Sequence, residues 1–187
     1  MKFSFATLAI VALLGTAGVQ SASAQKAKTV MVGGAPMYPT KNIVENAVNS
    51  KDHTTLVAAV KAAGLVETLS GPGPFTVFAP TNEAFNALPA GTVETLVKPE
   101  NKETLTKILT YHVVSGTMTS SDLMKAIKAG GGKATLTTVQ GEKLTAMMKG
   151  SKGIELKDEK GGVATVTIAD VMQSNGVIHV INKVLMP

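Results

Sequence analysis

The sequence of 187 residues contains no cysteine, no tryptophan and no arginine, and all 18 of its basic residues are lysine. Without cysteine the chain has no disulfide framework, no thiolate nucleophile and no cysteine-ligated zinc or iron–sulfur site. Without arginine it lacks the bidentate donor that most often recognises guanine edges, carboxylates and phosphates. These absences exclude several classes of enzyme and metalloprotein before any motif is considered.

Aromatic residues are also few, five Phe and two Tyr, and the lysines are scattered along the sequence rather than gathered in blocks. Nucleic-acid binding usually needs a clustered basic stripe, with aromatic or arginine side chains that stack on bases. We therefore expect no nucleic-acid partner. The hydrophobic content of 44% is that of a folded chain, and the length suggests one domain.

The first 24 residues have the pattern of an export signal. Lys2 provides a short positive region, residues 6–14 form an apolar run, and a small-x-small cleavage site ends at Ala24. Because crossing a bilayer takes about 20 apolar residues, we favour cleavage over a membrane anchor. The mature chain then has 17 Lys against 13 acidic residues, a net charge of +4. We expect it to be secreted, to the periplasm or the extracellular medium, without stable insertion into a membrane.

Residues 25–39 contain Gly-Gly and two prolines and show no hydrophobic period, which predicts a flexible lead-in. Residues 40–187 are expected to form a single domain. Helical periodicity dominates its first part and short β runs fill its second, so the fold class is α+β rather than alternating α/β. The expected helices are 41–48, 53–63, 82–88, 92–97, 99–112 and 121–129, and the expected strands are 75–79, 113–114, 134–139, 142–148, 154–156, 163–168 and 177–181. Asn175-Gly176 predicts a tight hairpin turn before the last strand, since both residues tolerate positive φ.

No catalytic or metal-binding motif is present. The sequence has no G-x-S-x-G nucleophile elbow, no phosphate-binding glycine loop and no H-E-x-x-H. The three histidines come from a helix start, a helix end and a buried strand, so no triad or metal centre is expected. We expect His53 to be solvated and His179 to be structural. For His112, on the apolar stripe of its helix, both a core histidine bonded to the backbone and a binding residue remain open.

The chain is rich in methionine, with nine residues. A copper(I) site built from Met and His would suit an exported protein. No M-x-M or M-x-x-M cluster occurs, however, and we favour core filling for these flexible side chains. Carriage of a metal or a small ligand in the periplasm is kept as the alternative function.

Three segments resemble signatures of the fasciclin domain family. Residues 75–85, FTVFAPTNEAF, are similar to its first signature, and residues 175–185, NGVIHVINKVL, are similar to its C-terminal one. Between them, Tyr111-His112 matches the central Tyr-His pair of the family. The three segments occur in the order and spacing of that family, and the similarity covers about residues 41–187, nearly the whole mature chain.

The resemblance implies a fold in which two β-sheets form a wedge with a layer of α-helices on one side. It also implies a secreted, non-catalytic module that mediates cell adhesion or attachment to extracellular matrix, with a surface protein or a polysaccharide as partner. No cofactor is expected, and we expect a monomer. Tyr111 and His112 are the expected partner-binding residues, and Asn82, at an exposed helix start, is a third.

Two departures from the family pattern limit what the resemblance implies. Asn182 stands where the C-terminal signature often has Asp, which affects any contact that needs a carboxylate there. The Asp-Ile dipeptides proposed as integrin-binding in animal members are absent. An integrin-binding role of the animal type is therefore not expected.

Overall fold

A computed structural model describes residues 29–187, and the expected export signal at residues 1–24 lies outside this range. The helices are α1 (Ile43–Ala47), α2 (Thr54–Ala63), α3 (Val66–Ser70), α4 (Asn82–Asn86), α5 (Thr92–Leu96), α6 (Lys102–Tyr111) and α7 (Ser120–Ala129), with two 3-10 turns, η1 (Lys51–His53) and η2 (Pro99–Asn101). The strands are β1 (Val30–Val32), β2 (Ala35–Met37), β3 (Phe75–Pro80), β4 (Val113–Ser115), β5 (Lys133–Thr137), β6 (Lys143–Lys149), β7 (Gly153–Lys157), β8 (Val163–Gln173) and β9 (Gly176–Ile181).

The long strand β8 joins two sheets into a wedge. The strand order is β4-β3-β9-β8-β7-β6-β5. Residues 163–165 of β8 pair with β7, whereas residues 166–173 pair with β9. Two register shifts lie between Val166 and Val171, and Asp170 there has a φ of 57°, so the strand is bulged where it passes from one sheet to the other. The predicted wedge of two sheets is confirmed.

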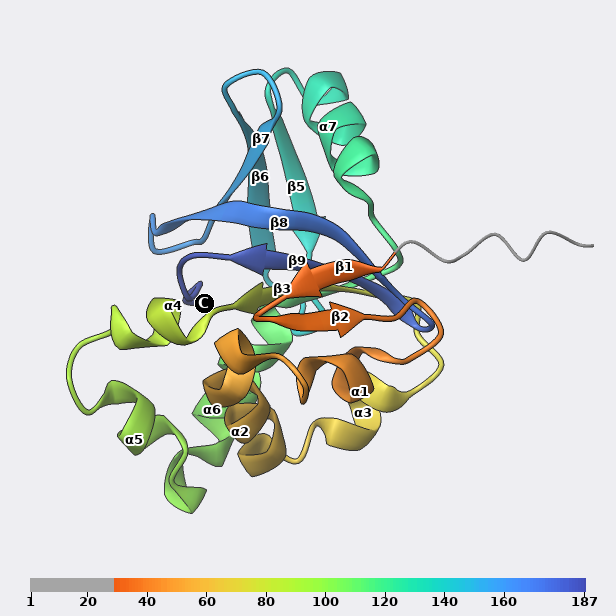
Figure 1. Ribbon diagram of the computed structural model, residues 1–187. Helices are drawn as coiled ribbons and strands as arrows, with labels where there is room; N and C mark the ends of the chain where they lie inside the picture. Colours follow the sequence, from red (N-terminus) through yellow and green to blue (C-terminus); the bar gives the residue numbers. More distant parts are fainter. Residues whose placement is uncertain (1–28) are drawn as a thin grey trace, which may run out of the picture.

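The helices fall into two groups (Figure 1). Helices α1 to α6 lie on one side of the sheet that contains β3 and β9, as predicted for a single helical layer. Helix α7 is apart from them and packs on β5, β6 and β7. Its residues Leu123 and Ile127 are fully buried in a second core inside the wedge.

Strand β3 separates the two cores because its alternate side chains point to opposite faces. Val77 and Ala79 pack in the core beneath the helical layer, whereas Phe78 packs in the core inside the wedge. Strand β9, which pairs with β3 in parallel, is buried along its whole length. A near-continuous apolar run predicts such a strand, buried on both faces.

Residues 30–37, predicted to belong to a flexible lead-in, instead form the hairpin β1–β2. Its side chains Val32 and Met37 are buried in the core beneath the helices. Gly33 and Gly34 make the two-residue turn with φ of 56° and 75°, the positive values that such a turn needs. The sequence did not predict this hairpin because strands of three residues are too short to show an alternating pattern.

The turn before β9 also differs from the prediction. Gln173 pairs with Gly176, so Ser174 and Asn175 form the turn, and Gly176 is an extended strand residue. Glycine is required at this position because a Cβ would lie 2.0 Å from the carbonyl oxygen of Phe75. The Asn175 side chain joins distant segments.

The side-chain amide of Asn175 makes three hydrogen bonds. Its oxygen accepts from the backbone N–H of Ile43 at 3.1 Å, and its nitrogen donates to the carbonyl oxygens of Leu69 and Gly71 at 2.8 and 2.9 Å. The residue therefore fixes the start of α1 and the end of α3 beside β9.

Substitution of Phe78 tests this description of the core. The side chain is fully buried, and its ring stacks on His179 with the ring centroids 5.7 Å apart. We expect Phe78→Ala to lower the free energy of unfolding by about 3–5 kcal/mol, measured by urea denaturation. The matched change Val97→Ala, at a side chain that is 37% exposed, should cost less than about 0.5 kcal/mol. A loss below about 1 kcal/mol for Phe78→Ala would contradict its place in the core.

Candidate functional site

Tyr111 and His112 are core residues. Tyr111 is 0% exposed and His112 is 3% exposed. The Tyr111 hydroxyl donates to the carbonyl oxygen of Lys143 at 2.9 Å, and burial raises its pKa to about 12. The two rings meet edge to face, with centroids 6.5 Å apart.

His112 ties the end of α6 to the C-terminal segment. Its Nε2 accepts from the backbone N–H of Leu185 at 3.0 Å, so the ring proton is on Nδ1, which donates to the carbonyl oxygen of Ile108 at 2.7 Å. Both ring nitrogens are therefore satisfied inside the protein. Burial lowers the pKa of His112 to about 4.

Tyr111 and His112, the expected partner-binding residues, do not form an exposed edge in this structure. A macromolecular partner contacts exposed atoms, and these side chains have almost none. The reason lies in their position at the end of α6, where the chain turns directly into the buried strand β4. The alternative interpretation of His112, a core histidine bonded to the backbone, is confirmed.

Asn82 is half-buried and acts as a structural clamp. Its amide oxygen accepts from the backbone N–H of Thr55 at 3.0 Å and from the Thr54 hydroxyl at 3.2 Å. Its amide nitrogen donates to the carbonyl oxygen of Lys51 at 2.8 Å. Because His53, the residue before α2, provides no capping side chain, Asn82 supplies the oxygen acceptor that an N-cap residue usually gives. Its polar atoms are thus already engaged within the chain.

The other two histidines are also buried. His53, predicted to be solvated, is 3% exposed, because η1 packs against the hairpin β1–β2, whose Gly33 carbonyl oxygen accepts from the Lys51 N–H at 3.2 Å. Its Nδ1 bonds the Ser50 hydroxyl at 2.8 Å, and its Nε2 has no hydrogen-bond partner. His179 is structural, as predicted, with Nε2 2.8 Å from the carbonyl oxygen of Met118. Burial lowers the pKa of both residues.

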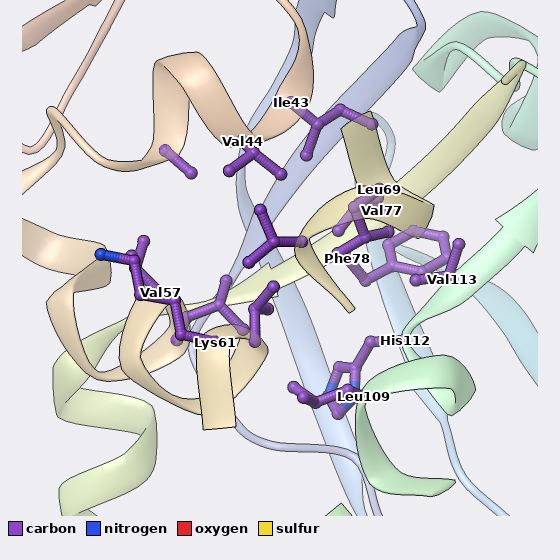
Figure 2. A pocket seen from close by; sticks show the side chains of 14 residues that line it. Ile43, Val44, Val57, Lys61, Leu69, Val77, Phe78, Leu109, His112 and Val113 are labelled. Atoms are coloured by element: carbon purple, nitrogen blue, oxygen red, sulfur yellow. The ribbon is translucent and has the colours of Figure 1, made fainter. Parts of the chain in front are cut away.

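Two hollows lie beside these residues. The first, between α1, α2, α3 and β3, is lined by apolar side chains apart from Lys61 and His112 (Figure 2). The second is lined by His53 and otherwise by apolar side chains from the hairpin, α1, α2 and the sheet. Neither was predicted from the sequence, because their lining residues come from segments far apart in the chain.

Five lysines gather at one end of the molecule. We call this end the basic tip, residues 125–133 and 149–153, formed by the end of α7, the start of β5 and the turn between β6 and β7 (Figure 1). It carries five Lys and no acidic residue, whereas the rest of residues 29–187 carries 10 Lys against 13 acidic residues. Strand pairing holds the tip together, since Lys133 lies opposite Met147 and Lys149 opposite Gly153.

A running charge count would have found the basic tip. Residues 123–153 contain six Lys and one acidic residue, although no two of these lysines are adjacent. Among residues 29–187, two lysines at the tip form ion pairs, Lys125 with Asp122 at 4.0 Å and Lys149 with Glu155 at 3.1 Å. The remaining tip lysines face solvent.

Within residues 29–187 no three His, Asp or Glu side chains converge as a metal site would require. Over the same range, every helix is too short or too polar to cross a membrane.

The buried histidines predict an acid-sensitive fold. His112 has a pKa of about 4 in the folded chain and an ordinary value of 6.5 when unfolded. Between these values the unfolded chain binds the proton and the folded chain does not, so stability is complete above pH 6.5 and falls as the pH drops toward 4. The loss from this residue is at most roughly 3 kcal/mol.

Urea denaturation from pH 7.5 to 4 tests this expectation. Because carboxylates also titrate in this range, the informative quantity is the difference between the wild type and His112→Gln, which keeps a donor and an acceptor but does not titrate. We expect the variant to be less stable at pH 7.5 and to lose less stability on acidification. Parallel pH profiles for the two proteins would contradict the assignment.

A second prediction concerns Asn82. Asn82→Ala removes the acceptor for the first turn of α2 and the donor to Lys51, so we expect a loss of about 1–2 kcal/mol in the free energy of unfolding. Asn86→Ala, an exposed change in the same helix, is the matched control and should be within about 0.5 kcal/mol of the wild type. Equal stability of the two variants would show that the clamp contributes nothing.

Known proteins with similar sequences cover most of this chain. A family model described as Fasciclin domain matches residues 51–187. Protein sll1483 of Synechocystis sp. is 50% identical over 160 residues, which are 86% of this chain and 81% of that protein. Immunogenic protein MPB70 of Mycobacterium bovis is 34% identical over 180 residues, 94% of this chain and 82% of that protein.

Larger proteins match over part of their length. Transforming growth factor-beta-induced protein ig-h3 of Sus scrofa is 42% identical over 132 residues, but these are only 17% of that protein. Among solved structures, a FAS1 domain pair from the insect cell adhesion molecule fasciclin I matches with a TM-score of 0.71 at 18% identity, over 80% of this chain and 52% of that chain. At this identity the structural match speaks for the fold alone. The chain belongs to the fasciclin domain family.

Proposed function

We propose that this protein is a secreted, non-catalytic binding module that attaches to an anionic polysaccharide of the cell envelope or extracellular matrix. The observation that carries the proposal is the basic tip, which concentrates five lysines on a domain that is otherwise acidic in balance. A positively charged surface attracts a polyanion and orients its approach. The tip takes the place of Tyr111 and His112 as the binding face.

The composition of the tip favours a polysaccharide over other polyanions. Among residues 29–187 the large exposed apolar side chains are Met31, Tyr38, Val48, Val97, Val139, Val163 and Met172. All of them lie outside the basic tip, so it has no apolar group to anchor in a bilayer. It also contains no aromatic residue to stack on nucleic-acid bases.

Glycine-rich turns lie next to the lysines of the basic tip. Gly130, Gly131 and Gly132 follow α7, and Gly150 is in the turn between β6 and β7. Lysine is a flexible point charge that adapts to carboxylate or sulfate groups at different spacings. Attachment of this kind agrees with the export pattern of residues 1–24 and with a family that includes a named insect cell adhesion molecule.

Binding to immobilised polyanions tests the proposal. The mature chain, residues 25–187, would be applied to alginate and to neutral dextran at low and at moderate salt. We expect saturable binding to alginate that weakens as salt screens the charges, and none to dextran. Binding to single-stranded DNA or to anionic vesicles that equals binding to alginate would contradict the choice of polysaccharide.

Matched triple variants locate the binding face. Lys128→Gln, Lys133→Gln and Lys152→Gln together remove three charges from the tip and should weaken alginate binding about tenfold or more. The control removes the same charge from the helical side, through Lys98→Gln, Lys102→Gln and Lys107→Gln, and should bind like the wild type. Equal losses in the two variants would mean that net charge, and not the tip, determines binding.

A further inference from the structure

The first hollow is an apolar cavity with a mouth between helices. Its cavity volume is about 40 Å³, and all the empty space between its walls, open solvent included, is about 540 Å³. Val44 of α1 and Val57 of α2 are half-buried at its edge, and the exposed Lys61 lines it with its aliphatic stem (Figure 2). His112 offers no free polar atom to the cavity, since both of its ring nitrogens are bonded to the backbone.

The second hollow shares a wall with the first. Ile43, Ala47, Leu56 and Val77 line both of them. The cavity volume of the second hollow is about 30 Å³. Ile43, Leu56 and Val77 have side chains with more than one rotamer, so a change of rotamer in the shared wall would join the two hollows into one path.

One polar side chain lines the second hollow. The ring of His53 is 3% exposed there. Its Nε2 has no partner at full hydrogen-bond geometry. Burial lowers the pKa of the ring, and the backbone of Ala79 is near enough to raise that pKa by a smaller amount. A buried nitrogen without a hydrogen-bond partner lowers the free energy of unfolding, and most such groups in proteins have a partner. A bound water is not expected to fill this role, because a buried water needs two to four polar partners and the other lining side chains are apolar.

The lining also restricts the charge of an occupant. No acidic side chain lines either hollow, and Lys61, at the mouth, is their only lysine. A charged group deep inside would lose its hydration without a counterion to replace it. A hydrocarbon chain, in contrast, would gain dispersion contacts with the walls and leave water.

We propose that the joined hollows bind an uncharged, unbranched hydrocarbon chain with one oxygen, of the alcohol or ketone class. The oxygen lies in the second hollow and bonds Nε2 of His53. The chain runs past Ile43 and Leu56 and leaves between α1 and α2 beside Lys61. The cavity volumes are small, so binding requires the walls to widen, and a slender chain requires less widening than a ring system.

The first test compares two probes of similar size on the mature wild-type protein. 1-Octanol carries the oxygen, whereas 1-chlorooctane does not. Isothermal titration calorimetry should show saturable binding of 1-octanol and about tenfold weaker binding of 1-chlorooctane, the difference expected for one buried hydrogen bond. Octanoate should bind more weakly than 1-octanol, since its charge would be buried. No binding of 1-octanol, or tighter binding of octanoate with its carboxylate beside Lys61, would overturn the proposal.

Variants identify the place where the probe binds. His53→Leu should remove the preference for 1-octanol over 1-chlorooctane, whereas Ala47→Phe should abolish binding of both by filling the shared wall. Val48→Phe is the matched control, because Val48 neighbours Ala47, is 48% exposed and lines neither hollow. A preference for 1-octanol that survives in His53→Leu would overturn the contact to Nε2. Equal loss of binding in Val48→Phe and Ala47→Phe would overturn the location.

The comparison of probes on the wild type decides the proposal even if His53→Leu does not fold. The site is also independent of the basic tip. The triple variant of tip lysines should bind 1-octanol like the wild type, and Ala47→Phe should bind alginate like the wild type. Loss of both kinds of binding in either variant would show that the two surfaces are not separate and would overturn the assignment of the ligand to this cavity.

Discussion

The parallel pairing of β3 with β9 is the constraint on which the rest of the fold depends. It joins Phe75 to Gly176 and Pro80 to Ile181, residues far apart in the sequence. Because helices cover one face of this pair and the wedge interior covers the other, almost every side chain of the two strands is buried. Each polar group between them must therefore find an internal partner. His179 and Asn175 do so, and their bonds fix the positions of the surrounding loops.

The sequence predicted the elements that have a clear hydrophobic period. The expected helices at 53–63, 99–112 and 121–129 correspond to α2, α6 and α7, and the run at 177–181 corresponds to the buried strand β9. Each of these helices buries one apolar stripe, and the strand buries both of its faces, so the residue types in these segments are strongly constrained. The hairpin β1–β2 and the short helix α3 were not predicted, since elements of three to five residues have little period to detect. The wedge followed from the resemblance of residues 75–85 and 175–185 to known signatures.

The candidate site was harder to predict because exposure is a property of the folded chain. Tyr111 and His112 have polar side chains of the kind found on protein surfaces. In the folded chain, however, backbone atoms of Lys143, Leu185 and Ile108 form hydrogen bonds with them in the core. His53 is next to a charged residue in sequence and is nevertheless covered by the hairpin. The lysines of the basic tip appear scattered along the chain, and only the antiparallel pairing of β5, β6 and β7 brings them to one end.

The separation of charge makes the domain an electric dipole. Five lysines stand at the tip, whereas seven acidic residues and six lysines lie in residues 40–112, which include every helix of the helical layer. In the field above a negatively charged surface such a molecule turns its positive end inward before it makes contact. Molecules that arrive in this way would lie side by side with one orientation, their helices and the mouth between α1 and α2 facing the solution.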